Sequence, residues 1–172
     1  MYGANFSHPA YYNVTERKVD YMKVDIYSRN AIEELINQDF PENVAVISFY
    51  DPPGKYKNVE PPVDYKGKVK KLFQVAVYDI DIEVLGEFGL NFDTYFTEVE
   101  ELAKFIFESY NEGLDIICQC EYGQSRSAAC AAAILEYFES DGISVFRDYR
   151  YYPNQLIFNK VYEALKLQGN DV

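Results

Sequence analysis

The feature that most constrains the fold of this 172-residue chain is a series of short apolar runs separated by helical patterns. The runs are 44–49 (VAVISF), 72–78 (LFQVAVY) and 114–119 (LDIICQ), preceded by an alternating segment at 22–27 (MKVDIY). Runs of this kind are typical of strands buried on both faces of a parallel sheet. Helices are expected near 30–37, 97–112, 125–140, 144–150 and 154–167. The pattern predicts an α/β fold, with a mostly parallel central sheet flanked by helices on both faces.

Capping signals predict where two of the helices begin. Either Ser28 or Asn30 can cap the first, and Glu33 is placed to complete a capping box with Asn30. Thr97 and Glu100 form a capping box that predicts the start of a helix at 97, and a glycine at 113 marks its end.

The length favours one domain over residues 1–172, with 1–20 as an arm on the surface. The arm is polar and aromatic without periodicity, and its single histidine, His8, is expected to be a surface residue. Cys118 and Cys130 are expected to pack in the core.

Charge and composition narrow the function. A net charge of −12 argues against wholesale binding to nucleic acid or to an anionic membrane, because either would need a basic face. No apolar run approaches the ~18 residues of a membrane-spanning helix, and the N-terminus resembles no signal peptide. Three cysteines form no disulfide framework, which favours a reducing, cytoplasmic location. The oligomeric state is left open.

The segment 120–126 (CEYGQSR) carries the chemistry, because it lies between a predicted strand and a predicted helix. A tight loop before a helix N-terminus turns backbone N–H groups inward and binds anions. Gly123 gives the loop backbone freedom, and Arg126 can hold two phosphate oxygens in its fork. Cys120 faces the same donors, and such a field also stabilises a thiolate. The loop therefore predicts a nucleophile and an oxyanion clamp in one place.

The pattern Cys-x-x-Gly-x-x-Arg-Ser at 120, 123, 126 and 127 resembles the signature of the cysteine-dependent protein tyrosine phosphatases. The nearest likeness is to the compact dual-specificity type and its bacterial relatives, with the phosphate loop between the last core strand and a helix. The resemblance implies hydrolysis of a phosphomonoester, on a protein or a small molecule, with no metal and no cofactor.

The resemblance also implies a role for each residue. Cys120 attacks phosphorus and forms a cysteinyl-phosphate, Arg126 stabilises the transition state, and Ser127 helps the thiolate leave. The remaining phosphate-binding positions are Glu121, Tyr122, Gly123, Gln124 and Ser125.

The resemblance further implies a general acid on a loop that follows an earlier strand. Asp79 at the end of 72–78 fits best, Asp81 is the alternative, and Asp93 fits less well. The chain departs from the family at Gln119, where histidine is usual; glutamine can hydrogen-bond the loop but carries no titratable proton.

Other functions remain open at this point. A phosphate-binding pseudophosphatase that no longer turns over is the main alternative. Arsenate reduction would need further cysteines after Cys130, and the Gly-x-x-Arg-Ser ending favours phosphate over sulfur transfer. A polyphosphorylated inositol substrate is less favoured, because no lysine or arginine stands at 121, 122, 124 or 125. The choice between phosphotyrosine alone and dual specificity stays open.

Overall fold

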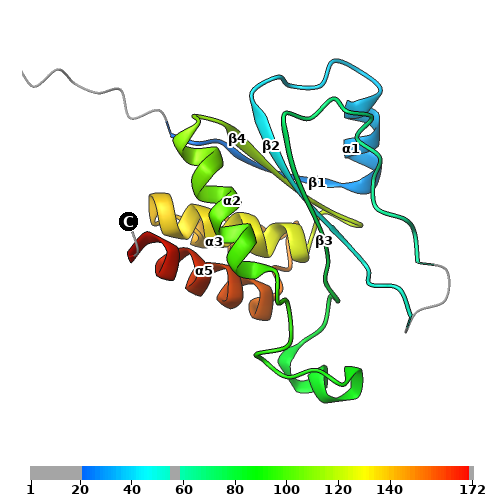
Figure 1. The fold of residues 1–172 in the computed structure, drawn as a ribbon, viewed down its shortest axis with the longest axis vertical. Helices are drawn as coiled ribbons and strands as arrows, with labels where there is room; N and C mark the ends of the chain where they lie inside the picture. The colour runs from blue at the N-terminus through cyan, green and yellow to red at the C-terminus, as the bar shows by residue number, and fades with distance from the viewer. Residues whose placement is uncertain (1–20, 55–58, 171–172) are drawn as a thin grey trace, which may run out of the picture.

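The computed structural model describes residues 21–54 and 59–170, and within them a four-stranded parallel sheet forms the centre of the molecule (Figure 1). Its strands are β1 (Val24–Ser28), β2 (Val44–Tyr50), β3 (Lys71–Ala76) and β4 (Asp115–Cys120), in the order β1-β4-β2-β3. All three pairings are parallel, so the predicted sheet is confirmed. The predicted arm at 1–20, with His8, lies outside the described residues.

Helices cover both faces of the sheet, as predicted (Figure 1). One face is packed by α1 (Arg29–Ile36) and the other by α2 (Val99–Asn111), α3 (Arg126–Glu139) and α5 (Gln155–Asn170). Alternation along β4 divides the two cores: Ile117 joins the α1 side, while Ile116 and Cys118 join the larger core. The predicted helices at 125–140 and 154–167 are confirmed within three residues at each end.

The alanine-rich stretch of α3 places helix and sheet in close contact. Residues 128–133 are all fully buried, and Cys130 among them packs with Cys118 of β4, as predicted for both cysteines. Burial raises the pKa of the Cys118 thiol well above its ordinary value, and its contact with Cys130 adds to the effect. Cys118 is therefore a neutral core residue.

Two predicted helix starts are wrong in detail. Ser28 does cap α1, accepting a bond from the Ala31 amide at 3.2 Å, but Glu33 pairs with Arg29 and forms no capping box with Asn30. A charged partner one turn away competes better for the carboxylate than a backbone amide does.

Helix α2 begins at Val99, two residues after the predicted cap. Phe96, the residue before Thr97, is buried and has a left-handed φ of 58°, so the backbone is not yet helical there. Thr97 Oγ1 bonds the neighbouring Glu98 carboxylate at 3.1 Å and does not cap the helix. The predicted end is confirmed, because Gly113 has a φ of 69° and lies just past the helix.

Two short elements differ from the predicted pattern. The segment expected to be a helix at 144–150 holds only the single turn α4 (Ile143–Phe146), and the expected loop after β3 contains a 3-10 helix, η1 (Ile82–Phe88). Among the described residues no helix is long and apolar enough to cross a bilayer.

The parallel topology brings four chemically useful residues to one edge of the sheet. Ser28 and Cys120 are the last residues of β1 and β4 and are paired in register. Asp51 directly follows β2, and Asp79 lies three residues past β3. This carboxyl edge is where ligands bind in open parallel sheets.

Candidate active site

The loop 121–125 leaves the end of β4 and enters α3, as predicted, and Gly123 fixes its shape. Gly123 has a φ of 65°, and a Cβ there would lie 2.6 Å from the backbone N of Ser28. The Glu121 carbonyl accepts a bond from the Arg29 amide at 3.1 Å on the same strand-to-helix junction. The loop is therefore packed backbone against backbone on the β1–α1 turn, which only glycine permits.

Cys120 lies at the base of the loop, 3 % exposed. Its Sγ is 3.0 Å from the hydroxyl Oγ of Ser127, which is also buried, in the first turn of α3. A hydroxyl at this distance can donate to a thiolate and stabilise its charge. The structure thus brings together two of the predicted residues.

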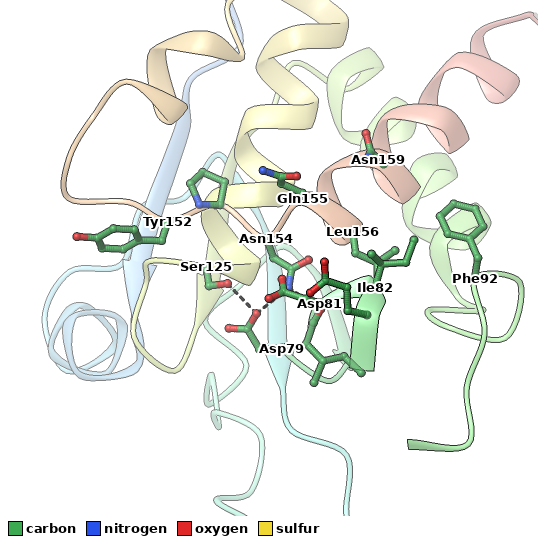
Figure 2. Close-up of a pocket in the computed structure, with 13 residues that line it drawn as sticks. Asp79, Asp81, Ile82, Phe92, Ser125, Tyr152, Asn154, Gln155, Leu156 and Asn159 are labelled. Carbon is green, nitrogen blue, oxygen red and sulfur yellow. Dashed lines mark hydrogen bonds between the residues drawn. The ribbon is translucent and has the colours of Figure 1, made fainter. Parts of the chain in front are cut away.

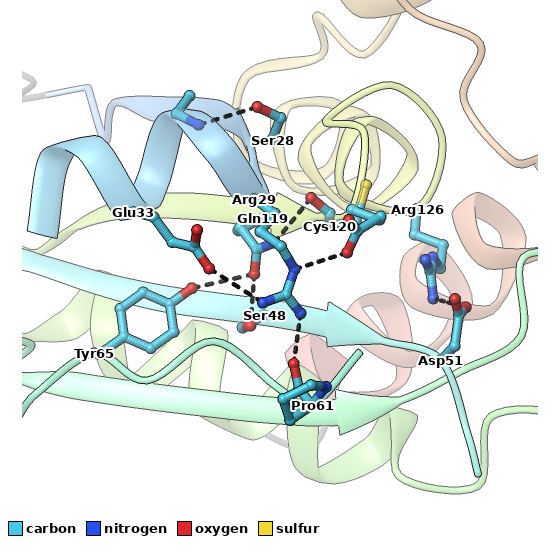
Figure 3. Close-up of polar contacts among 12 residues, drawn as sticks. Ser28, Arg29, Glu33, Ser48, Asp51, Pro61, Tyr65, Gln119, Cys120 and Arg126 are labelled. Atoms are coloured by element: carbon cyan, nitrogen blue, oxygen red, sulfur yellow. Dashed lines mark hydrogen bonds and ion pairs between the residues drawn. The ribbon is translucent and has the colours of Figure 1, made fainter. Parts of the chain in front are cut away.

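Arg126 is the first residue of α3, and its side chain is buried beneath the loop (Figure 3). Its Nη1 donates to Asp51 Oδ1 at 2.7 Å and to the Val77 carbonyl at 2.9 Å. Its Nε is buried and has no partner among the described residues. A buried guanidinium N–H without an acceptor costs about 1–3 kcal/mol or more, so this group is prepared for an acceptor from outside the chain.

Asp79 is tied to the loop on its other side (Figure 2). Its Oδ1 accepts bonds from the Ser125 hydroxyl at 2.7 Å and from the Asn154 amide at 3.0 Å. The same amide reaches the Ile80 carbonyl at 3.0 Å. Of the two predicted candidates for the general acid, Asp79 is therefore bonded to the loop, and both Asp79 and Asp81 line the neighbouring pocket.

The buried side chain of Tyr95 supports the segment that carries Asp79. Its hydroxyl donates to the Tyr78 carbonyl at 2.7 Å, one residue before Asp79. Burial raises the pKa of Tyr95, and the Asp79 carboxylate raises it further. The phenol stays protonated and holds the backbone in place.

The buried amide of Gln119 stands where histidine is usual in the resembled family (Figure 3). Its Oε1 accepts bonds from Ser48 at 2.7 Å and from Tyr65 at 3.2 Å, and its Nε2 donates to the Cys120 carbonyl at 2.8 Å. The expectation that glutamine can hydrogen-bond the loop is confirmed. Neither Gln119 nor Tyr65 loses a proton near neutral pH, because an amide does not titrate and burial raises the pKa of Tyr65 to about 12.

The other predicted loop positions differ in their surroundings. The Glu121 carboxylate accepts a bond from Arg29 Nε at 2.8 Å and is held away from the loop centre. Tyr122 is 78 % exposed, and the Gln124 carbonyl accepts a bond from the Tyr152 amide at 2.8 Å. These side chains shape the rim, while their backbone forms the loop.

Sequence reasoning missed Asp51 and Arg29, and it favoured aromatic packing over a place at the site for the stretch 149–154, which ends at Asn154. Each lies next to a recognisable signal: Asp51 ends a buried strand, Arg29 follows a helix cap, and Asn154 follows a proline. Their partners are 75 or more residues away in the chain, so the signals could not reveal the pairings.

A pocket of about 630 Å³ adjoins the loop (Figure 2). Its walls come from the segment after β3, from Phe92, and from the start of α5, and it meets the loop at Ser125. Cys120 and Arg126 do not line it, so it is a neighbour of the thiol site. No cluster of three or more metal-binding side chains occurs within 21–54 and 59–170.

Comparisons with known proteins agree with this geometry at the level of fold. No family model matches the chain, and no curated protein does. Among solved structures, human DUSP28 is similar with a TM-score of 0.51 and 13% identity over 89% of this chain and 98% of that one. The structure of PTPMT1 in complex with PI(5)P is also similar, with a TM-score of 0.52 and 13% identity over 89% of this chain and 97% of that one.

A third similar structure is the human tyrosine phosphatase-like serine/threonine/tyrosine-interacting protein, with a TM-score of 0.50 and 16% identity over 81% of this chain and 87% of that one. The chain has the dual-specificity phosphatase fold. Within this fold, the loop 120–126 runs from the carboxyl end of β4, the last strand in the sequence and an inner strand of the sheet, into α3, as the resemblance implied.

Proposed function

We propose that this chain is a cysteine-dependent phosphomonoester hydrolase of the protein tyrosine and dual-specificity phosphatase type. The observation that carries the proposal is the unpartnered, buried Nε of Arg126 in a loop whose Cys120 Sγ lies 3.0 Å from Ser127 Oγ. A phosphate oxygen supplies the missing acceptor, and the thiol supplies the nucleophile.

In the first step the Cys120 thiolate attacks phosphorus and the bond to the leaving oxygen breaks. Asp79, protonated, gives its proton to that oxygen, so the product leaves as a neutral alcohol or phenol. Arg126 and the loop amides of 121–126 hold the oxygens of the transferring phosphoryl group. Asp81 is the alternative acid, and the hydrogen bond from Ser125 to Asp79 favours Asp79.

In the second step water attacks the cysteinyl-phosphate and the S–P bond breaks. Asp79, now a carboxylate, takes the proton from the water, which leaves inorganic phosphate. Ser127 donates its hydroxyl hydrogen to the departing thiolate of Cys120 and lowers the cost of its charge.

The substrate we favour is a phosphorylated protein, with phosphotyrosine as the reference case. One of the similar structures is PTPMT1 in complex with PI(5)P. The loop of this chain, however, carries Glu121 and has no lysine or arginine between Cys120 and Arg126. A polyphosphorylated headgroup would meet too little positive charge there. A thiol nucleophile needs a reducing compartment, which supports a cytoplasmic location.

Turnover of p-nitrophenyl phosphate, and its inhibition by vanadate, tests the proposal. Cys120→Ser should abolish turnover and retain vanadate binding, because the amides and Arg126 remain. Cys130→Ala is the matched control: this thiol is buried among alanines of α3 and should be dispensable for turnover. Activity of Cys120→Ser within tenfold of wild type would exclude the thiol mechanism.

Binding of phosphate without turnover is the alternative, a pseudophosphatase. The substitution of Gln119 for histidine motivates it, and one similar structure is itself described as phosphatase-like and as an interacting protein. Vanadate binding by a wild-type chain that hydrolyses neither p-nitrophenyl phosphate nor a phosphotyrosine peptide would establish this alternative.

A further inference from the structure

The pocket beside the phosphate loop is continuous with the proposed reaction site through two residues. Ser125 belongs both to the loop and to the pocket wall, and Asp79, to which Ser125 is bonded at 2.7 Å, lines the same pocket. A leaving group that receives a proton from Asp79 would therefore lie beside this pocket, whose lining residues are drawn in Figure 2.

The pocket is acidic. Besides Asp79 it is lined by Asp81 and Glu83, both exposed to solvent, and no lysine or arginine lines it. At its edge, Lys160 Nζ donates to the carbonyl of the pocket residue Phe92 at 2.9 Å and lies 4.5 Å from the centre of the Phe92 ring. The chain already stabilises one cation at this wall, with the ring and carbonyl of a pocket residue.

The remaining walls suit an extended peptide. Gln155 and Asn159 lie four residues apart on α5, so their amides share one helical face, and both line the pocket. Each primary amide offers a donor and an acceptor, which is what a peptide group requires. Tyr152, 72 % exposed, and Phe92 add aromatic surface on which a guanidinium can stack.

We propose that this pocket binds an arginine or lysine side chain next to the phosphorylated residue of a peptide substrate. The inference rests on the proposed phosphatase function and names a substrate class for it. Asp81 and Glu83 provide the charge, while Asp79 serves the reaction. The volume of about 630 Å³ accommodates a long side chain with part of its backbone, more than a lone ammonium group would fill.

The test compares kcat/KM for phosphotyrosine peptides that differ only in one residue, arginine, glutamine or glutamate. The variable residue is placed directly before phosphotyrosine in one set and directly after it in another. We expect wild type to prefer arginine over glutamine by about fivefold in at least one set, the scale of one or two solvent-exposed ion pairs. The preference should shrink at high salt, because exposed charges are screened.

Variants of Glu83 locate the effect. Glu83→Gln should reduce the arginine preference, and Glu83→Lys should reverse it in favour of glutamate. Both should keep wild-type turnover of p-nitrophenyl phosphate, because its leaving group carries no positive charge with which the Glu83 carboxylate could pair. Glu101→Gln, on the exposed face of α2, is the matched control and should keep the preference.

Equal kcat/KM for the arginine and glutamine peptides in both sets, with p-nitrophenyl phosphate still hydrolysed, would overturn this inference and leave the proposed function standing. Hydrolysis of phosphocholine faster than of every arginine peptide would also overturn it, in favour of a small ammonium substrate. Failure to hydrolyse any of these esters would instead contradict the proposed function itself.

Discussion

Asp51 Oδ1 and Arg126 Nη1 form an ion pair of 2.7 Å between residues 75 positions apart, one just after β2 and the other at the start of α3. The arginine is almost fully buried, whereas the carboxylate is 37% exposed. The pair fixes one arm of the guanidinium and leaves Nε for a ligand. Asp51 thus acts through Arg126 as a positioning residue.

Asp51→Ala should lower kcat on p-nitrophenyl phosphate by about tenfold or more, because small displacements of a catalytic group are costly. Asp51→Asn keeps an acceptor oxygen and should lose less. Steady-state kinetics together with vanadate affinity check this. Unchanged kcat in Asp51→Ala would mean that the Val77 carbonyl alone holds the guanidinium.

Arg126→Lys should lower kcat by ~10²-fold or more, the usual scale for loss of an oxyanion donor. A lysine keeps the charge but has no Nε and cannot form a two-point contact. The measurement is kcat and KM for the same ester. If only KM changed, the arginine would bind substrate without stabilising the transition state.

Asp79→Asn should slow a phosphotyrosine peptide far more than p-nitrophenyl phosphate, because a general acid contributes ~10²–10⁴-fold and poor leaving groups need it most. It should also flatten the alkaline limb of the pH–rate profile. Asp81→Asn is the matched comparison and should do neither. Exchange of the two behaviours would assign the acid to Asp81.

Gly123→Ala should destabilise the fold by about 2 kcal/mol or more and reduce turnover. A left-handed backbone costs alanine about 1–2 kcal/mol. The new Cβ would in addition lie 2.6 Å from the Ser28 backbone nitrogen, which is a clash. Gly113 also has a left-handed φ, of 69°, but a Cβ there would meet no atom within 4 Å. Gly113→Ala should therefore lower the free energy of unfolding only by the backbone strain. Urea denaturation measures both, and equal losses would contradict the close packing.

Stability should fall in alkali because of Tyr65. Its pKa is raised from 10.0 to about 12 in the folded chain, so above pH 10 the unfolded chain releases a proton that the folded chain keeps. Each pH unit in the window from 10 to 12 then costs up to about 1.4 kcal/mol, and below pH 10 the effect is absent.

Tyr65→Phe should make the fall of the unfolding free energy between pH 10 and 12 less steep, measured by urea denaturation at each pH. Tyr95, whose pKa is also raised by burial, keeps its own share of the fall. Tyr149→Phe, at an exposed position, is the control and should keep the wild-type slope. The same slope in all three proteins would show that Tyr65 does not carry the effect.

Much of the fold could be predicted because its signals are local. The run VAVISF is apolar but for one serine and carries three β-branched residues, and the motif 120–127 has its cysteine, glycine, arginine and serine within eight residues. Helix starts were less predictable. The capping box at Thr97 is a valid local pattern, but the buried, left-handed Phe96 delays the helix, and burial of an aromatic ring outweighs one capping bond.

The residues of the site that lie together in the sequence were the most predictable. Cys120, Ser127 and Arg126 follow from one motif, whereas Asp51 and Asn154 reach the loop through strand order and helix packing. The local sequences around them, 50–53 (YDPP) and 152–155 (YPNQ), do not predict that either segment contacts the loop. The hydrogen bond from Ser125 to Asp79 likewise joins residues 46 positions apart, and the spacing of residues in the sequence does not predict it.

The position of β4 has a consequence for how the chain reaches its native state. It is the last strand in the sequence, yet it lies between β1 and β2, each of which must already be available for pairing. Its partners on β1 are 92 residues away, and such distant pairings are slow to form. The nucleophile at the end of β4 is thus assembled with one of the latest contacts, and refolding monitored by recovered turnover should lag behind refolding monitored by helix content.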